Sequence, residues 1–120
     1  MNPILWQRFE GAIVATAIVF ATIEMGFAWW WLLALFLAFD FSAIGYVVNA
    51  RIGAFAYNAA HQYGAGAAAI VGFLVLDQRW LALLGLCWLF HVAVDRAWGY
   101  GLKHADDFHH THLGHIGRRK

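Results

Sequence analysis

The sequence predicts an all-α integral membrane protein, a four-helix bundle with short loops and a His-rich cytoplasmic C-terminal tail. Hydrophobic residues make up 62% of the 120 residues and charged residues only 12%, against roughly 45–50% and 25% in soluble domains. A soluble domain of this length could not bury so much apolar surface in its own core. The apolar residues also gather in four long segments, which no proline interrupts. Lipid is therefore the expected surrounding of the chain.

The four segments run over about residues 4–23, 27–48, 54–76 and 80–100, and residues 101–120 form the tail. Each segment is close to the roughly 20 residues that a helix needs to cross the hydrocarbon core. The connections between them are only a few residues long, so neighbouring helices must be antiparallel. We therefore expect residues 1–120 to form a single transmembrane domain.

Basic residues predict the orientation, because cytoplasmic loops of membrane proteins carry an excess of Lys and Arg. With four spans both termini lie on one side. That side collects six basic residues: Arg8, Arg51, Lys103, Arg118, Arg119 and Lys120. The opposite loops offer Arg79 alone. We expect both termini in the cytoplasm.

Composition also narrows the classes of function. A formal net charge of +1, with no basic patch interleaved with aromatic residues, gives no reason to expect nucleic acid as a partner. The single Cys87 lies inside an apolar run and rules out a disulfide framework or a thiolate cluster. The seven Trp residues fit helix ends at the membrane interface and contacts with lipid or partner proteins.

Ionisable residues inside the spans carry the functional signal, because each is costly in lipid and usually functional. Five of them fall at one depth, roughly 8–14 Å below the cytoplasmic boundary at 1.5 Å per residue: Glu10, Asp40, His61, His91 and Asp95. All four expected helices contribute to this layer. His91 and Asp95 are four residues apart and share one helix face. Inward carboxylates and imidazoles at one level are the arrangement that forms metal sites in four-helix di-iron proteins.

The residue types favour zinc, iron or manganese. Imidazole and carboxylate ligands without a usable thiolate argue against copper(I) and iron–sulfur clusters. Tyr57 and Asn58 lie on or near the face of His61 and are candidates to orient it. Arg96 cannot be a ligand, but its guanidinium can pair with a carboxylate or bind the anionic group of a substrate or lipid.

Plainer interpretations remain open for each residue taken alone. An intramembrane histidine is often hydrogen-bonded to a neighbouring helix and nothing more. Asp95 and Arg96 can form an interfacial ion pair, and Glu10 can extend its carboxylate to the surface. The five tail histidines can be solvated or bind metal adventitiously: His104, His109, His110, His112 and His115. The shared depth of five residues on four helices is harder to explain in these ways.

Several of these residues also belong to a longer pattern. Its first half contains Glu10-Gly11, Asp40-x-Ser42-x-x-Gly45-Tyr46, and Gly53-Ala54 with Tyr57-Asn58-x-x-His61. Its second half contains His91-x-x-x-Asp95-Arg96-x-x-Gly99-Tyr100-Gly101-Leu102-Lys103, then Phe108 and Thr111-His112-Leu113-Gly114. Over nearly the whole chain this resembles a family of small bacterial integral membrane proteins known only as a domain of unknown function. The resemblance implies a small helical protein of the bacterial inner (cytoplasmic) membrane and no established activity.

A fainter similarity links the pattern to membrane-bound metal-dependent hydrolases, which also pair a His and an Asp near a helix end with a later Thr-His. Two features depart from the resembled family. Phe39 precedes Asp40 where a proline is usual, and His109, His110 and His115 are peculiar to this chain. The resemblance therefore favours His112 over its neighbours as a metal ligand.

Two classes of function follow. In the first, the protein is a metal-dependent hydrolase of a lipid-like substrate. Its metal would be held by Asp40, His61, His91, Asp95 and His112. Glu10 would be the general base, because an apolar setting raises the pKa of a carboxylate, and Arg96 with Lys103 would bind a phosphate or carboxylate.

In the second class, the protein is a non-enzymatic accessory subunit of a larger membrane protein complex that binds pigment or haem. His61 and His91 would then be axial ligands of haem or bacteriochlorophyll, and the many aromatic side chains would face a partner protein or lipid. This interpretation leaves Glu10, Asp40 and Asp95 without a role.

Overall fold

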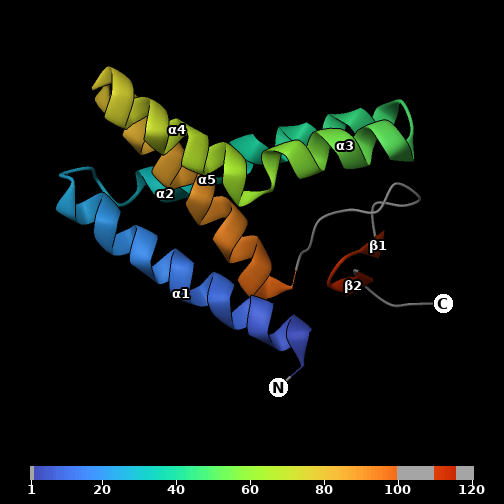
Figure 1. Ribbon diagram of the computed structural model, residues 1–120. Helices are drawn as coiled ribbons and strands as arrows, with labels where there is room; N and C mark the ends of the chain where they lie inside the picture. Colours follow the sequence, from blue (N-terminus) through green and yellow to red (C-terminus); the bar gives the residue numbers. More distant parts are fainter. Residues whose placement is uncertain (1, 100–109, 116–120) are drawn as a thin grey trace.

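The computed structural model describes residues 2–99 and 110–115, with side chains for all of these except residues 37, 39–43, 110, 114 and 115. The elements are α1 (Pro3–Glu24), α2 (Trp31–Ala34), the 3-10 helix η1 (Phe36–Val47), α3 (Ala50–Ala60), α4 (Tyr63–Leu76) and α5 (Arg79–Trp98). Two short strands, β1 (His110–Thr111) and β2 (Gly114–His115), pair antiparallel. The predicted fold class, an all-α four-helix arrangement, is confirmed (Figure 1).

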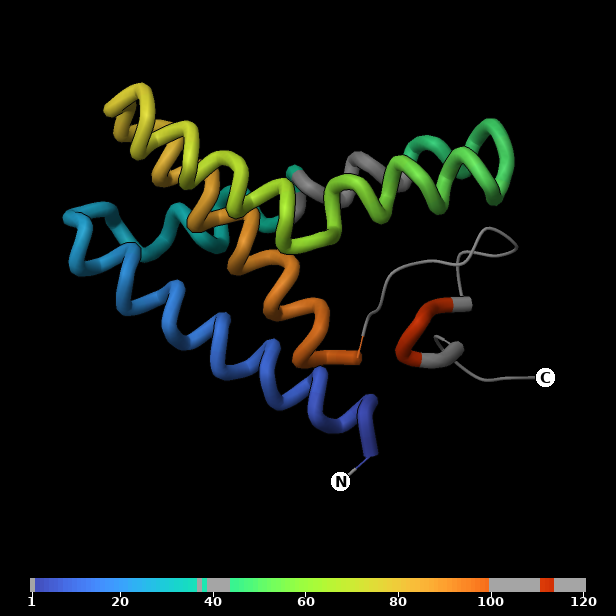
Figure 2. The backbone as a smooth tube through the Cα atoms, viewed as in Figure 1, coloured from blue at the N-terminus to red at the C-terminus, as the bar shows by residue number. Residues whose placement is uncertain are grey.

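Within residues 2–99 and 110–115, three helical stretches are long and apolar enough to cross a membrane: Pro3–Glu24, Ala50–Leu76 and Arg79–Trp98. The second expected span, 27–48, consists of the short α2 followed by η1. The third, expected as one helix over 54–76, is broken into α3 and α4, and the chain turns at their junction (Figure 2).

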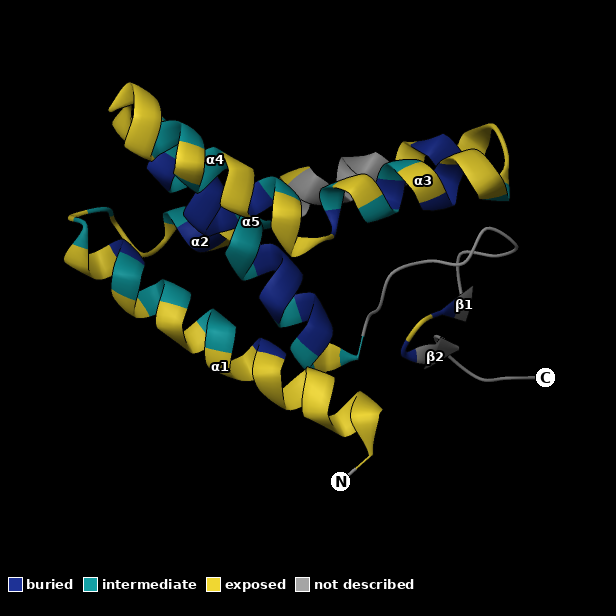
Figure 3. Ribbon diagram, in the orientation of Figure 1, coloured by how far each residue is buried: buried dark blue, intermediate teal, exposed yellow. Residues whose placement is uncertain are grey.

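The helix α5 lies at the centre of the fold, packed between α1 and α4 and touching α2 and η1 (Figure 1). It is the most buried helix, whereas α1 is largely exposed (Figure 3). Small residues permit this packing, because helices in lipid associate through close backbone approach. A Cβ on Gly11 of α1 would lie 2.7 Å from the carbonyl oxygen of Ala93 on α5.

The helices α1 and α5 are antiparallel. At one end Arg8 donates through Nε to the carbonyl oxygen of Ala97 (3.0 Å). At the other end Arg79 donates to the carbonyl oxygen of Met25 and lies over the ring of Phe27. The start of α1 and the end of α5 therefore share one end of the molecule.

Exposed tryptophans mark both ends of this helix pair. Trp6 in α1 and Trp98 at the end of α5 are 51% and 62% exposed at the end that holds the start of α1. Trp29, Trp30 and Trp80 are 56%, 49% and 61% exposed at the other end. Two levels of exposed tryptophan separated by an apolar helix are typical of the two interfaces of a bilayer.

The η1–α3 pair extends away from α5 as a hairpin, to the right in Figure 1. Its two helices meet at glycines: a Cβ on Gly53 would lie 2.2 Å from the ring of Tyr46, and one on Gly45 would lie 3.1 Å from the Cα of Gly53. This hairpin carries His61 at the inner end of α3, where it meets α5.

Candidate metal centre and adjoining pocket

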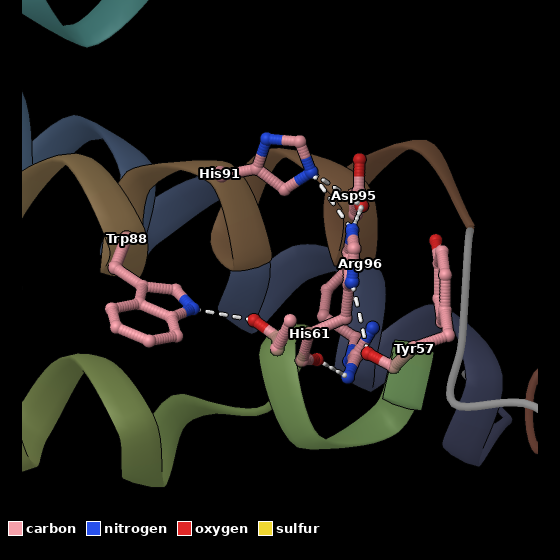
Figure 4. A network of polar contacts seen from close by, with 7 residues as sticks. Tyr57, His61, Trp88, His91, Asp95 and Arg96 are labelled. Atoms are coloured by element: carbon pink, nitrogen blue, oxygen red, sulfur yellow. Dashed lines mark hydrogen bonds and ion pairs between the residues drawn. The ribbon is translucent and has the colours of Figure 1, made fainter. Parts of the chain in front are cut away.

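Three atoms that could bind a metal meet at α5: two belong to this helix and the third to His61, the C-cap of α3. The Nε2 atoms of His61 and His91 are 3.1 Å apart. The Oδ2 atom of Asp95 lies 3.3 Å from Nε2 of His91 and 3.7 Å from Nε2 of His61. Both imidazoles are fully buried and Asp95 is 6% exposed. We call these three residues the triad (Figure 4).

The size of the triad fits a metal ion. The point equidistant from the three ligand atoms is about 2.0 Å from each of them, and zinc bonds to imidazole nitrogen and carboxylate oxygen measure about 2.0–2.1 Å. Three protein ligands also leave a position for water or substrate, which is the pattern of catalytic zinc sites.

Contacts with Tyr57 orient the His61 ring so that its Nε2 atom faces His91 and Asp95. Its Nδ1 atom lies 3.0 Å from the carbonyl oxygen of Tyr57, one helical turn earlier. Because a carbonyl oxygen only accepts, Nδ1 of the neutral ring must carry the proton and Nε2 presents its lone pair. This is how a metal-binding histidine is usually oriented. The Tyr57 ring also stacks on the His61 ring, with centroids 3.7 Å apart.

His61 terminates α3, and this is where the structure departs from one continuous third helix. Gln62 takes the extended backbone of an N-cap, and its side-chain oxygen accepts from the N–H of Gly64 at 3.0 Å. The next helix therefore starts with a cap of its own. The carbonyl groups of Ala60 and His61 then need donors from elsewhere, because unsatisfied carbonyl groups are costly in lipid.

The helix α5 supplies both donors. The indole N–H of Trp88 donates to the carbonyl oxygen of Ala60, and Arg96 donates to that of His61 at 2.7 Å. Thus α5 contributes two corners of the triad and also holds the backbone that carries the third (Figure 4).

Arg96 also lines a polar pocket of about 210 Å³ next to His61. Its walls come from α1, the α3–α4 junction, α5 and the β1–β2 turn: Gln7, Glu10, Gln62, Tyr63, Arg96 and His112. His112 lies within 2.8 Å of the side-chain oxygen of Gln7 through its Nε2 atom. We call this the polar pocket.

The structure therefore divides the residues that the sequence singled out. His61, His91 and Asp95 meet in the triad. Glu10, Arg96 and His112 line the polar pocket. Glu10 is exposed there, and its apolar setting stays a prediction. The side chain of Asp40 lies outside the described residues.

The turn at 110–115 rests against the start of α1 through the His112–Gln7 contact, and Thr111 and Leu113 are buried. Lys103, Phe108 and His109 lie outside the described residues. The helix α5 ends at Gly99, which adopts the left-handed conformation (φ 92°) of a helix C-cap.

Two residues hold the backbone around His61 and were not identified from the sequence: Trp88 and Gln62. Trp88 was counted only among interfacial tryptophans, and Gln62 was not considered. Gln62 follows His61 directly, and a polar side chain able to cap a helix inside an apolar span is a signal for a break. No comparable signal marked Trp88, because only the break creates the carbonyl group that it binds.

Nothing in the part of the chain that the structure describes indicates the haem alternative. Bis-histidine ligation would require a flat macrocycle between two nitrogen atoms that are 3.1 Å apart. The rings of Phe36 and Tyr57 also lie against the two imidazoles, with centroids 4.2 Å from His91 and 3.7 Å from His61.

Comparison with known protein families matches residues 4–116 to the family described as Domain of unknown function (DUF4260). No curated protein matches the chain. No solved structure matches it either.

Proposed function

The chain belongs to the DUF4260 family, and since that description assigns no activity, we propose from its own side chains that it is a membrane-embedded metal-dependent hydrolase of a lipid-like substrate. The observation that carries the proposal is the triad: three buried ligand atoms separated by 3.1, 3.3 and 3.7 Å. The residue types favour zinc, with iron and manganese as the alternatives.

A bound zinc would lower the pKa of its water towards about 7 and so supply a hydroxide nucleophile. The residues of the chain would do the rest. Asp95 and the two imidazoles hold the ion, and the Tyr57 carbonyl keeps His61 in the metal-binding tautomer. Arg96 binds the anionic group of the substrate. Glu10 stays a prediction as the general base, because it lines the polar pocket and not the triad. Asp40 stays a prediction as a further ligand.

Without a metal, the 3.1 Å contact between Nε2 of His61 and Nε2 of His91 requires a proton on one of the two atoms. The triad is then a buried hydrogen-bond network. Metal content separates these cases. Protein purified without a metal-affinity step should contain about one metal ion per chain, measured by inductively coupled plasma mass spectrometry.

His91→Ala should lose most of this metal, because within the described residues no other imidazole joins His61 and Asp95. His109→Ala is the matched control and should keep it. Equal metal in the parent and both variants, or none in any, would remove the metal centre. Release of fatty acid or phosphate from a bacterial lipid extract, present in the parent and absent in His91→Ala, would then establish hydrolysis.

We also propose that both termini face the cytoplasm of a bacterial inner membrane. The antiparallel packing of α1 and α5 supports a shared side for the two ends, and Arg8 lies at that end while Arg79 lies at the other. Reporter fusions after Arg51 and after Lys120 should both give a cytoplasmic signal. A periplasmic signal from either would contradict this topology.

A further inference from the structure

The polar pocket differs from the other hollows of the molecule. All six of its described lining side chains are polar, whereas a shallow groove farther along α1 is lined almost entirely by apolar or small residues: Ala12, Ile13, Thr16, Ala17 and Phe20. At about 210 Å³ the polar pocket is smaller than the roughly 300–1,000 Å³ of pockets that enclose a whole drug-sized ligand. It has the size for a polar group alone.

The pocket contains one buried cation, Arg96, and one exposed carboxylate, Glu10. Arg96 is only 6% exposed, and a guanidinium is always charged and suited to planar recognition of phosphate. Glu10 is exposed, so its side chain is less restrained than that of Arg96. Gln7, Gln62, Tyr63 and His112 add side chains that can donate hydrogen bonds. An anionic group with several oxygen atoms fits this set.

The apolar groove lies farther along α1 than the pocket. Ile13 and Ala17 follow Glu10 by three and seven residues and so lie on the same side of the helix. A ligand whose polar group occupies the polar pocket can therefore lay a hydrocarbon chain on the groove without leaving the lipid.

The pocket also lies at interfacial depth. Arg96 is two residues before the end of α5 at Trp98, about 3 Å along the axis. The exposed Trp6 and Trp98 mark the same end of the molecule. Phosphate groups of membrane lipids lie at this level of a bilayer.

From these observations we propose that the polar pocket binds the phosphate of a phosphorylated amphiphile, with its acyl chain on the groove formed by Ala12, Ile13, Thr16, Ala17 and Phe20. This names the substrate class of the proposed hydrolase and rests on that function for the reaction, since a metal in the triad would add positive charge beside Arg96. The binding itself requires only the pocket and the groove.

Three probes separate the phosphate from the chain: dioctanoyl phosphatidic acid, dioctanoylglycerol, which lacks the phosphate, and inorganic phosphate, which lacks the chains. Each is titrated calorimetrically into the full-length protein in detergent. Phosphatidic acid should bind at least about tenfold more tightly than either other probe, since a hydrogen bond to a charged group contributes about 1.5–3 kcal/mol. Equal binding of phosphatidic acid and dioctanoylglycerol would overturn the pocket, and equal binding of phosphatidic acid and inorganic phosphate would overturn the groove.

One variant tests the polar pocket and another tests the groove for the acyl chain. Tyr63→Phe, which removes one hydroxyl group and leaves the Arg96–His61 contact intact, should weaken phosphatidic acid and inorganic phosphate alike, by about fivefold. Ala17→Phe fills the groove and should weaken phosphatidic acid alone, whereas Val71→Phe, on an exposed position of α4, should weaken neither. If Tyr63→Phe and Ala17→Phe both bind phosphatidic acid as the parent does, the proposal fails.

Metal content measured on the same samples distinguishes this proposal from the proposed function. Phosphatidic acid binding in a protein that carries no metal would retain the pocket and reject the hydrolase. Stoichiometric metal in a protein that binds all three probes equally would retain the metal centre and reject the pocket.

Discussion

The triad and the polar pocket lie side by side but are built in opposite ways. The triad is buried, uses three side chains, and depends on α5 for two ligands and for both donors that hold the backbone around His61. The polar pocket is partly open and takes its walls from α1, the α3–α4 junction, α5 and the 110–115 turn. The difference teaches that one helix supplies most of the triad, whereas the polar pocket forms only where several elements come together.

The two sites share Arg96, which lines the pocket and donates to the His61 carbonyl. Most other residues belong to one site only. Variants can therefore change one site and leave the other, and the following predictions use this separation, from the largest expected effect to the smallest.

The largest difference is expected between two histidines. His61→Ala removes a corner of the triad and should reduce metal content to background, because the two remaining ligands bind an ion weakly. His112→Ala removes a wall of the polar pocket and should leave metal content unchanged. Elemental analysis of the two purified variants checks this. Loss of metal from His112→Ala would extend the metal centre into the 110–115 turn.

A smaller effect is expected from the backbone contact. Trp88→Phe leaves the Ala60 carbonyl group without its donor and loosens His61, so metal affinity should fall about 10–100-fold, as for other groups that orient a ligand. The metal titration is compared with that of Trp98→Phe, an exposed tryptophan of the same helix. Equal affinities in these two variants would show that the bond from Trp88 has no part in positioning His61.

A still smaller effect is expected from loosening the contact between α1 and α5, because α1 lines the polar pocket but contributes nothing to the triad. Gly11→Ala places a Cβ 2.7–2.8 Å from α5 backbone atoms and should destabilise the protein by about 1–3 kcal/mol, as overpacked sites do. Because the clash separates α1 from α5, phosphatidic acid binding should weaken while metal content holds.

The matched control is Gly72→Ala, whose Cβ would meet Leu81 at an ordinary 3.4 Å. It should leave stability unchanged or raise it by up to about 1 kcal/mol, because Ala favours a helix over Gly. Thermal unfolding in detergent measures both variants. Similar melting temperatures for the two would contradict the close α1–α5 packing.

The smallest effect is expected at the far end of the hairpin. The side chain of Asn49 caps α3 by accepting from the N–H of Ile52 at 2.8 Å, and Asn49→Ala should cost about 1 kcal/mol. Neither metal content nor phosphatidic acid binding should change. A loss of metal here would indicate that the whole of α3, and not only the contacts from α5, positions His61.

Much of the candidate site could be predicted without coordinates. His91 and Asp95 share a helix face by their spacing alone, and the cost of burying them in lipid marks them as functional. His61 was expected at the same depth. The helix break that positions His61 was not expected, because the apolar residues over 54–76 are compatible with one unbroken helix. The break is stabilised by hydrogen-bond donors from α5, which is distant in the sequence.

By itself, the sequence determined the membrane character, the four helical segments and the polar residues worth examining, because apolar length and the cost of charge in lipid act locally along the chain. Only the tertiary structure decided which of those residues meet. The distances within the triad, the separation of Glu10 from it and the exposure of Glu10 depend on how α5 packs against α1 and α4. That packing depends on close approach at Gly11, Gly66 and Gly85. Each approach involves the surfaces of two helices, so the sequence of one segment alone does not reveal it.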